Sequence, residues 1–472
     1  MKRTACVIGS GPNGLAAAIV LAQAGLQVEV YEAEAQLGGG ARTAELTLPG
    51  FHNDVASAVH PLGIGSPFFS SLPLQNFGLQ WIHSPAAVAH PMDDGSAVLL
   101  HRDLHIQERE LGQDGKAWRN LMEPFAARWW EFAPEVLRPM PRLPRHPFLL
   151  ARFGLRVLPP ARTLANTVFR TERAKALWAG IAAHSFLSHD EWLSTAFGMV
   201  LSIAAHAVGW PIPRGGAQSL SDALCAQLSA LGGSVKASSR VSNLADLPES
   251  GLFMFDVTPR QLVNIAGERF TPTFRRLLQN FEYGPGVFKV DYALSSPIPW
   301  KAQDCATAAT VHVGGTLDEI AASEQAMSDG RHAEHPFVIL TQPSLFDSTR
   351  APEGKHTAWA YCHVPNGSNF DMLGRIEDQI ERFAPGFREC VLGRKVFSPA
   401  ALESVDSNII GGDISGGRLT VRQLLFRPTW RHYGTSARDI YICSSSTPPG
   451  GGVHGMCGYH AAKMALSKLP KN

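Results

Sequence analysis

A glycine turn near the start of the chain carries the clearest chemical signal in the sequence. Gly9, Gly11 and Gly14 form a G-x-G-x-x-G pattern, and the acidic residue Glu32 follows after a second apolar run. Glycines at this spacing permit a tight turn, let the backbone approach a pyrophosphate, and allow a helix to pack closely on a strand. A carboxylate at the position of Glu32 accepts hydrogen bonds from ribose hydroxyls and repels a 2′-phosphate. The pattern predicts a dinucleotide site, with NAD and FAD both open at this point.

The elements around this turn are those that position such a site. We expect a buried strand at Thr4–Ile8, an alanine-rich helix at Leu15–Ala24 and a second strand at Gln27–Tyr31. The helix N-terminus would supply unpaired N–H groups and partial positive charge for phosphates. Strand, glycine turn, helix and strand in this order predict a Rossmann-like unit.

Two further glycine-rich turns are not part of a plain NAD fingerprint. One is the run Gly39-Gly40-Ala41-Arg42, in which the arginine offers a fork of donors to phosphate. The other, residues 444–458, lies between a strand expected at Asp439–Cys443 and a helix expected at about Tyr459–Leu466. A glycine turn before a helix N-terminus suits an anionic or electron-rich group.

These turns resemble motifs of FAD enzymes in the amine oxidase and phytoene desaturase superfamily. Residues 39–42 resemble its GG-R motif, and residues 444–458 resemble the terminal flavin motif of bacterial phytoene desaturases. Further runs narrow the resemblance to the phytoene desaturase-like subgroup often labelled "pyridine nucleotide-disulphide oxidoreductase domain-containing": 283–292, 297–300, 351–356, 364–365 and 411–414. The resemblance covers nearly the whole chain and implies FAD as the cofactor.

The glycine pattern and the resemblance together assign the cofactor contacts. In the family, the backbone of Val241 would lie over the adenine, and the C-terminal turn would face the flavin. The residues expected at FAD are Gly9, Gly11, Pro12, Asn13, Gly14, Glu32, Ala33, Gly39, Gly40, Arg42, Val241, Gly451, Gly452, Val453, His454 and Met456. No metal site is expected.

The chain departs from the family pattern at four positions. Ala41 replaces the second glycine of GG-R, and Ser444 replaces a glycine. Pro448 replaces the usual histidine, and His454 stands where proline is common. The resemblance places the last two close to the flavin ring, so they argue against a carotenoid substrate and leave FAD binding intact.

The separation of the glycine turns predicts a discontinuous domain. A helix expected at Ser219–Leu231 and a strand at Ser234–Val241 would form its middle piece. The fold class we expect is α/β, with a Rossmann-like FAD-binding domain and an α+β substrate domain that has a mixed or antiparallel sheet and a helical cap. The predicted FAD-binding parts are 1–75, 211–270 and 401–472, and the predicted substrate-domain parts are 76–210 and 271–400.

The substrate domain is expected to contain several strands. Val88–Met92 and Ala97–His101 indicate a hairpin. Further strands are expected at Phe288–Leu294, Phe337–Thr341 and Thr357–His363.

Bulk composition limits the class of protein. A chain of 472 residues is too long for one ordinary core, so two or three domains are expected. The formal net charge of +1 gives no reason to expect a nucleic-acid partner. The 7 cysteines are scattered and form no C-x-x-C pair, which favours a reducing compartment and opposes dithiol chemistry. Because the first strand begins at Thr4, we expect no targeting peptide and a cytoplasmic location.

Two segments raise the question of membrane contact. Trp192–Pro213 has no Asp, Glu, Lys or Arg and is long enough to span a bilayer, but polar groups such as Ser202 and His206 are costly in lipid. We therefore expect a buried helix there. Arg138–Lys175 has nine basic residues against the single acid Glu172. This stretch is either a peripheral membrane surface or a solvated helical face that packs on the core.

The expected activity follows from the cofactor. The chain has one dinucleotide fingerprint, so a second fold for NAD(P)H is not indicated. We expect a dehydrogenase or desaturase that transfers a hydride from a CH–CH unit of an apolar or amphipathic substrate to flavin N5, with reoxidation by oxygen or a quinone. His60 and His454 are candidates for a base or proton relay, and Asp54 matches a family aspartate at the entry to the flavin site.

Three alternatives stay open. One is an amine or alcohol oxidase that acts on a C–N or C–O bond, for which Tyr433 and Tyr459 are candidate aromatic residues. The others are a redox-neutral isomerase and a non-catalytic flavoprotein that binds a partner.

Overall fold

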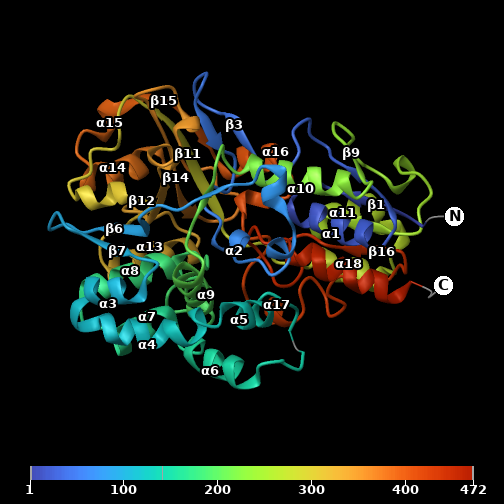
Figure 1. Ribbon diagram of the computed structural model, residues 1–472, viewed down its shortest axis with the longest axis horizontal. Helices are drawn as coiled ribbons and strands as arrows, with labels where there is room; N and C mark the ends of the chain where they lie inside the picture. The colour runs from blue at the N-terminus through green and yellow to red at the C-terminus, as the bar shows by residue number, and fades with distance from the viewer. Residues whose placement is uncertain (1–2, 141, 470–472) are drawn as a thin grey trace.

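The computed structural model describes residues 3–140 and 142–469, and two sheets organise it (Figure 1). A parallel five-stranded sheet has the order β16-β10-β1-β2-β9, and a mixed seven-stranded sheet has the order β15-β11-β14-β13-β12-β6-β7. The strands of the first sheet are β1 (Thr4–Ile8), β2 (Gln27–Tyr31), β9 (Ser234–Lys236), β10 (Phe253–Phe255) and β16 (Ile440–Ile442). Those of the second are β6 (Ala86–Pro91), β7 (Ala97–Leu100), β11 (Gly286–Leu294), β12 (Ala308–Val313), β13 (Val338–Thr341), β14 (His356–Val364) and β15 (Val391–Phe397).

The remaining elements are helices and two short strand pairs. The pairs are β3 (Thr43–Glu45) with β4 (His52–Asp54), and β5 (Trp81–Ile82) with β8 (Ile212–Pro213). The helices are α1 (Pro12–Gln23), α2 (Pro61–Ile64), α3 (Leu104–Glu110), α4 (Gly115–Ala126), α5 (Trp129–Val136), α6 (Pro147–Val157), α7 (Ala161–Val168), α8 (Glu172–Ala183), α9 (Ser194–Ala207), α10 (Gln218–Ala230), α11 (Pro259–Ala266), α12 (Pro272–Gln279), α13 (Leu317–Ser328), α14 (Leu373–Phe383), α15 (Phe387–Cys390), α16 (Pro399–Val405), α17 (Val421–Leu425) and α18 (Met456–Lys468).

The five-stranded sheet is buried on both faces, as its apolar strands require. Successive side chains of a strand point to opposite faces. Ala5 and Val7 of β1 therefore join the core beneath α1, α10 and α18, while Cys6 and Ile8 pack with residues of α11 and α12. Strands from the three expected FAD-binding parts meet in this one sheet.

The seven-stranded sheet also has two different faces. Val338 and Leu340 pack with α14, whereas Ile339 points to the opposite face, toward the main core. Helices α3 to α9 cover one end of this sheet and form the helical layer seen at the lower left of Figure 1. The expected fold class is confirmed: a Rossmann-like unit lies beside an α+β unit with a mixed sheet and a helical cap. The domain boundaries themselves stay predictions.

The elements differ from the sequence prediction mainly at their ends. The hairpin β6–β7 and the strands β11, β13 and β14 lie within a few residues of their predicted positions. Helix α1 begins at Pro12 rather than Leu15, since proline is well tolerated at the first helical position. The strand expected at Ser234–Val241 was wrong in length: β9 ends at Lys236, because Ser238 has φ +49° and turns the chain away.

The apolar segment at 192–213 forms a buried helix, as expected. Helix α9 has 14 residues, shorter than the roughly 20 that a bilayer requires. Its Ser194 and Thr195 hydroxyls bond to the backbone of the loop and helix near Ala161. Among residues 3–140 and 142–469, no helix is long and apolar enough to cross a membrane.

Candidate functional site

The first glycine turn forms a cradle in which side chains have no room. A Cβ on Gly9 would lie 2.8 Å from the carbonyl oxygen of Asp256, and a Cβ on Gly11 would lie 2.6 Å from its Oδ2. A Cβ on Gly14 would lie 2.2 Å from the carbonyl oxygen of Gly9, so Gly14 allows the helix to pack against the turn. In the first turn of α1, Pro12 has no N–H and the N–H of Gly14 donates to Oδ2 of Asp256, so the N–H of Asn13 is the one that can face a phosphate here.

Glu32 stands at the end of β2 and is held in one orientation. Its carboxylate accepts hydrogen bonds from the backbone N–H of Ser10 (2.8 Å), the Ser10 hydroxyl (2.6 Å) and the backbone N–H of Glu34 (3.0 Å). Each carboxylate oxygen has further lone pairs. Glu32 and Ala33 both line a cavity, so this acid fits the predicted ribose contact.

Arg42 ties the second glycine turn to a distant segment. Its Nε donates to the carbonyl oxygen of Gly39 (2.6 Å), and its Nη2 donates to that of Val405 (3.0 Å). The side chain is buried and lines the same cavity as Glu32. Two of the donors expected to face phosphate are therefore used to fix the backbone around the site.

The C-terminal turn lies against the first one. A Cβ on Gly458 in α18 would lie 1.8 Å from the carbonyl oxygen of Asn13, which places the starts of α18 and α1 in direct contact. Gly451, Gly452 and Val453 line a cavity together with Gly11, Pro12, Asn13, Gly39 and Gly40. The glycine turns at the two ends of the chain thus form one site.

Two neighbouring cavities make up this site. One, of about 390 Å³, is lined by Gly9, Glu32, Arg42 and Val241. The other, of about 370 Å³, is lined by the C-terminal turn and extends to the seven-stranded sheet. Both are lined by Gly11, Gly39, Asp256, Asp406 and Asn408. The pair of cavities fits an elongated dinucleotide, and the glycines leave the space that such a group needs.

Three of the predicted FAD contacts, Gly14, His454 and Met456, are not among the residues that line the two cavities. Gly14 acts in packing, as described above. Met456 is the first residue of α18, and its backbone N–H donates to Nδ1 of His454 (3.0 Å). These residues support the glycine turns through packing and hydrogen bonds. Their contact with a cofactor stays a prediction.

Asp256 is a residue that sequence reasoning missed. It follows β10, and its Oδ2 accepts a hydrogen bond from the backbone N–H of Gly14 (2.8 Å). Burial raises the pKa of its carboxyl group to about 7, with smaller contributions from nearby carboxylates. A signal was present: an apolar run that ends in an acid, as in the strand before Glu32. Without a glycine motif this signal is weak.

His60 is the predicted catalytic candidate that lies in the cavity. Its ring is buried, and neither ring nitrogen has a hydrogen-bond partner among residues 3–140 and 142–469. Burial lowers the pKa of His60 to about 4, although Asp54 acts in the opposite direction. The imidazole is therefore neutral at physiological pH and can accept or donate one hydrogen bond.

His454 lies just behind the lining. Its Nδ1 is used by Met456, and its Nε2 is buried with no partner in the described part of the chain. Burial lowers its pKa to about 4. Tyr433 and Tyr459 also lie outside the lining, and the Tyr433 hydroxyl donates to the carbonyl oxygen of Pro448 (2.8 Å).

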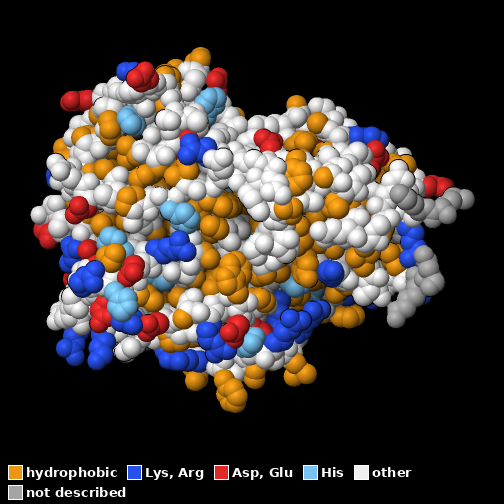
Figure 2. Space-filling model, viewed as in Figure 1, with side chains coloured by type: hydrophobic (Ala, Val, Ile, Leu, Met, Phe, Trp, Pro, Cys, Tyr) orange, Lys and Arg blue, Asp and Glu red, His pale blue; other side chains and the backbone are white. Residues whose placement is uncertain are grey.

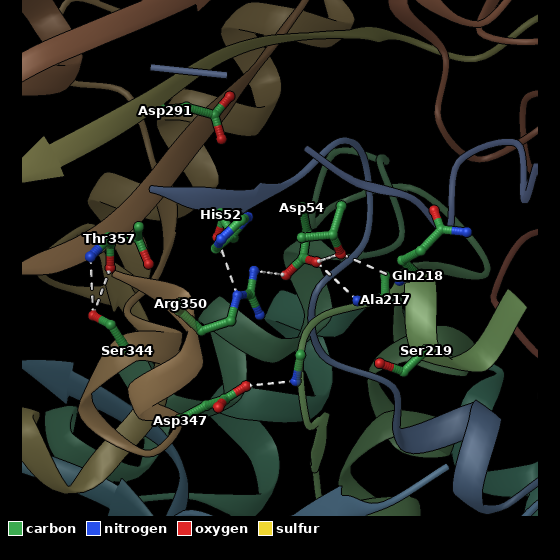
Figure 3. A network of polar contacts seen from close by, with 12 residues as sticks. His52, Asp54, Ala217, Gln218, Ser219, Asp291, Ser344, Asp347, Arg350 and Thr357 are labelled. Carbon is green, nitrogen blue, oxygen red and sulfur yellow. Dashed lines mark hydrogen bonds and ion pairs between the residues drawn. The ribbon is translucent and has the colours of Figure 1, made fainter. Parts of the chain in front are cut away.

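Asp54 belongs to a buried network that joins the β3–β4 pair to the segment between β13 and β14 and to the start of α10 (Figure 3). Its Oδ2 pairs with Arg350 (2.7 Å), and its Oδ1 accepts from the Thr43 hydroxyl (2.7 Å) and from the backbone N–H of Ala217 (2.8 Å). Asp54 and Arg350 are both fully buried. Asp54 is not among the residues that line the two cavities, so these contacts fit a structural role better than direct contact with a reacting group.

The sheet side of the cavity that the C-terminal turn lines is largely aromatic and apolar. Trp359 and Tyr361 of β14 stack with ring centroids 5.5 Å apart. Other lining residues from this side include Phe186, Phe197, Leu201, Trp210 and Ile339. One cavity therefore connects the glycine cradle to a wall that can hold an apolar group.

Comparisons with known proteins agree with this geometry. Residues 7–70 match the family model described as an NAD(P)-binding Rossmann-like domain. The chain is 26% identical to rat "Pyridine nucleotide-disulfide oxidoreductase domain-containing protein 2", over 98% of this chain and 93% of that protein. It is 24% identical to a neurosporene-forming phytoene desaturase of Rhodobacter capsulatus, over 96% of this chain and 92% of that protein.

A solved structure shows the same fold. The structure of putrescine oxidase bound to putrescine aligns with a TM-score of 0.62 over 99% of this chain and 100% of that one, at 16% identity. Taken with the relatives, this likeness in fold agrees with the resemblance found in the sequence: over nearly its whole length the chain is similar to proteins of the amine oxidase/phytoene desaturase-like family.

Proposed function

We propose that this protein binds FAD and dehydrogenates a CH–CH unit of an apolar or amphipathic substrate to a C=C bond. The observation that carries this proposal is the single cavity that runs from the glycine cradle at Gly11 and Gly451 to the aromatic wall at Trp359. A cofactor in the cradle and a substrate on the wall would share one space. The relation to a phytoene desaturase supports the same reaction class.

The residues of the chain have defined tasks in this proposal. When bound, FAD supplies the acceptor for the hydride that the substrate loses, and oxygen or a quinone then removes the electrons. The cradle fixes the cofactor, and the apolar wall holds the substrate and excludes water. The second hydrogen leaves as a proton, and we assign its acceptance to the neutral imidazole of His60, which lines the cavity and has no hydrogen-bond partner in the described chain.

The direct test is anaerobic bleaching of the flavin in purified protein. We expect a yellow protein that releases FAD on denaturation and loses its visible absorbance with members of a lipid and polyene library. Mass spectrometry of the product should show a loss of two hydrogen atoms. A protein without FAD contradicts the proposal, and a stable flavin that no substrate bleaches favours an isomerase or a non-catalytic partner-binding flavoprotein.

Two histidine variants test the proton-transfer step. His60→Ala should retain FAD and slow flavin reduction by about 10²-fold, the lower end of general base effects. His454→Ala, which removes a side chain outside the cavity lining, should have a smaller effect. His90→Ala is a matched control, because His90 is buried, lies outside the cavity lining and hydrogen-bonds to the carbonyl oxygen of Gly315. Unchanged reduction rates in His60→Ala would remove this residue from the mechanism.

Oxidation of a C–N bond is the second candidate function. The stacked pair Trp359 and Tyr361 in the cavity favours it, because aromatic faces attract ammonium groups, and the fold is shared with putrescine oxidase. Peroxide release with a panel of primary and secondary amines would support this alternative. Release with alcohols only would favour C–O oxidation.

We also propose contact with an anionic membrane surface as the source of the substrate, for a cytoplasmic protein. Part of the basic stretch is neutralised, since Arg162, Arg173 and Lys175 form ion pairs with acids. The part around α6 is different: Arg142, Arg145 and Arg152 are exposed, beside Leu143 and Phe148, which are 95% and 90% exposed. Apolar side chains project beside basic ones at the lower edge of Figure 2.

Liposome co-sedimentation tests this surface. The full-length protein should sediment with vesicles that contain phosphatidylserine and less with neutral vesicles. Replacement of Arg142, Arg145 and Arg152 by Glu should abolish the difference. Equal, negligible binding of both proteins would contradict the proposal.

A further inference from the structure

Three polar side chains form a row on the cavity face of the seven-stranded sheet. In the antiparallel register, Thr310 of β12 lies opposite Thr341 of β13, and Thr341 lies opposite Trp359 of β14. Directly opposed residues of neighbouring strands project from the same face of a sheet. All three residues line the cavity that extends from the C-terminal turn to this sheet.

No residue in the described part of the chain forms a hydrogen bond with the polar atoms of these three side chains. The hydroxyl oxygens of Thr310 and Thr341 and the indole Nε1 of Trp359 are buried and have no hydrogen-bond partner within residues 3–140 and 142–469. Buried polar groups in proteins are almost always hydrogen-bonded, because leaving them without a partner is costly. Three such groups side by side in one cavity indicate that a molecule in the cavity provides the partner.

The positions of these side chains are fixed by their neighbours. Trp359 stacks on Tyr361, and Nζ of Lys289 lies 5.1 Å from the centroid of its ring. Lys289 is itself buried and paired with Asp291. The indole N–H therefore has a defined position, and the positive charge behind the ring is already neutralised.

The chemistry of the row selects the ligand. An indole N–H only donates, while a threonine hydroxyl both donates and accepts. The matching group is an oxygen that accepts from Trp359 and shares hydrogen bonds with the threonines. An ammonium group has no lone pair for the indole N–H, and a carboxylate would need a free positive charge that Lys289 does not offer. A neutral hydroxyl or carbonyl oxygen fits best.

We propose that Thr310, Thr341 and Trp359 bind a neutral oxygen of the substrate, so that the substrate is an apolar chain or ring with a hydroxyl or carbonyl group. This inference rests on the proposed function, because it places the oxygen in the cavity that begins at the cofactor cradle. It makes the row a determinant of specificity that discriminates oxygenated substrates from hydrocarbons and amines.

Isothermal titration calorimetry on the FAD-loaded protein tests the proposal. The probes are a matched series of a decanone, a decanol, decane and decylamine. Wild type should bind the decanone and decanol at least tenfold more tightly than decane and decylamine, with a net gain of about threefold to tenfold for each hydrogen bond. The double variant Thr310→Val/Thr341→Val conserves shape and should lower this ratio to the roughly threefold preference that the remaining N–H of Trp359 supports.

Thr357→Val is the matched control. Thr357 is also on β14 and has a buried hydroxyl without a partner in the described chain, but it does not line the cavity. This variant should keep the wild-type preference. Equal affinities for decanone and decane in wild type, no binding of any probe, or a wild-type preference that is undiminished in the double variant would overturn the proposal. The FAD content of each sample is measured separately, so that a failure of cofactor binding is distinguished from a failure of this inference.

Discussion

The glycine cradle and the sheet wall of the same cavity are built in different ways. The cradle is made of backbone: Gly9, Gly11 and Gly451 lie where a Cβ would collide with neighbouring atoms. The wall is made of side chains that three strands bring together, among them Thr341 and Trp359. The cradle leaves little freedom for substitution, whereas the wall can change its side chains without changing the fold. This difference explains how one family fold serves several reactions, since the cofactor end is fixed by geometry and the substrate end by residue choice.

A buried ion pair connects these two regions. Arg350 follows β13 of the wall, and Asp54 ends β4, where it pairs with Thr43 directly after Arg42 of the second glycine turn. Nε of Arg350 also donates to the carbonyl oxygen of His52 (3.0 Å), as Figure 3 shows. The difference between the cradle and the wall can therefore be tested by breaking this ion pair and by changing each of the two regions separately.

Breaking the ion pair between Asp54 and Arg350 should have the largest effect on stability. Arg350→Met leaves the carboxylate of Asp54 buried without its positive partner, and such a loss destabilises a protein by about 3–5 kcal/mol. Chemical denaturation followed by intrinsic fluorescence would measure the free energy of unfolding. Arg162→Met is the control, because its ion pairs with Asp190 and Asp318 are exposed and worth less than about 1 kcal/mol. Equal losses in both variants would show that the buried pair does not hold the two regions together.

Filling the cradle should have the second largest effect. A methyl group at position 14 would lie 2.2 Å from a backbone oxygen, so Gly14→Ala forces α1 away from the turn. We expect FAD affinity to fall roughly a hundredfold, about 2–3 kcal/mol, while ligand contacts on the wall stay intact. FAD retained after gel filtration would be measured by absorbance.

A second glycine provides the control for that experiment. Gly154 lies in α6, and a Cβ there would meet no atom within 4 Å. Gly154→Ala should therefore retain FAD fully and gain slightly in stability, because alanine favours a helix. Loss of FAD in this variant as well would mean that the cradle is not the sensitive region.

The sequence predicts the cradle better than the wall, because the two regions are built in different ways. The cradle depends on local patterns: β1, α1 and β2 follow each other directly, so the glycine spacing and Glu32 already describe the site. The wall depends on pairing between segments far apart in the chain. Thr310, Thr341 and Trp359 become neighbours only through the register of β12, β13 and β14, which no local pattern specifies.

The prediction for Asp54 shows a further reason why the sequence alone did not predict the whole site. The sequence indicated an acid near the flavin entry, but its ion partner Arg350 lies almost 300 positions later in the chain, and the pairing becomes visible only in the folded structure. The missed residue Asp256 is similar, because its contact with Gly14 joins the end of β10 to the first turn of α1 across 242 positions. Local motifs predict which backbone binds a ligand, and long-range contacts decide which acids remain free to act.

The pH dependence of FAD binding should give the smallest effect and tests the cradle alone. The carboxyl group of Asp256 has a pKa of about 7, raised by burial, so it is neutral below pH 7 and negative above it. Because its folded-state pKa lies above the unfolded value, its contribution to stability declines as the pH rises from about 4 to 7. The negative form would also repel a pyrophosphate at Gly11, so FAD affinity should fall about tenfold between pH 6 and pH 8.

Asp256→Asn turns this expectation into a decisive measurement. Asparagine has the same shape and its amide oxygen can still accept the hydrogen bond from the backbone N–H of Gly14. Fluorescence titration of apoprotein with FAD should therefore give a dissociation constant that hardly changes from pH 6 to pH 8 in the variant. If wild type and variant weaken in parallel, the titrating group is elsewhere. A flat profile only in the variant would show that the cradle, although built from backbone, is tuned by one buried side chain that the glycine motif does not reveal.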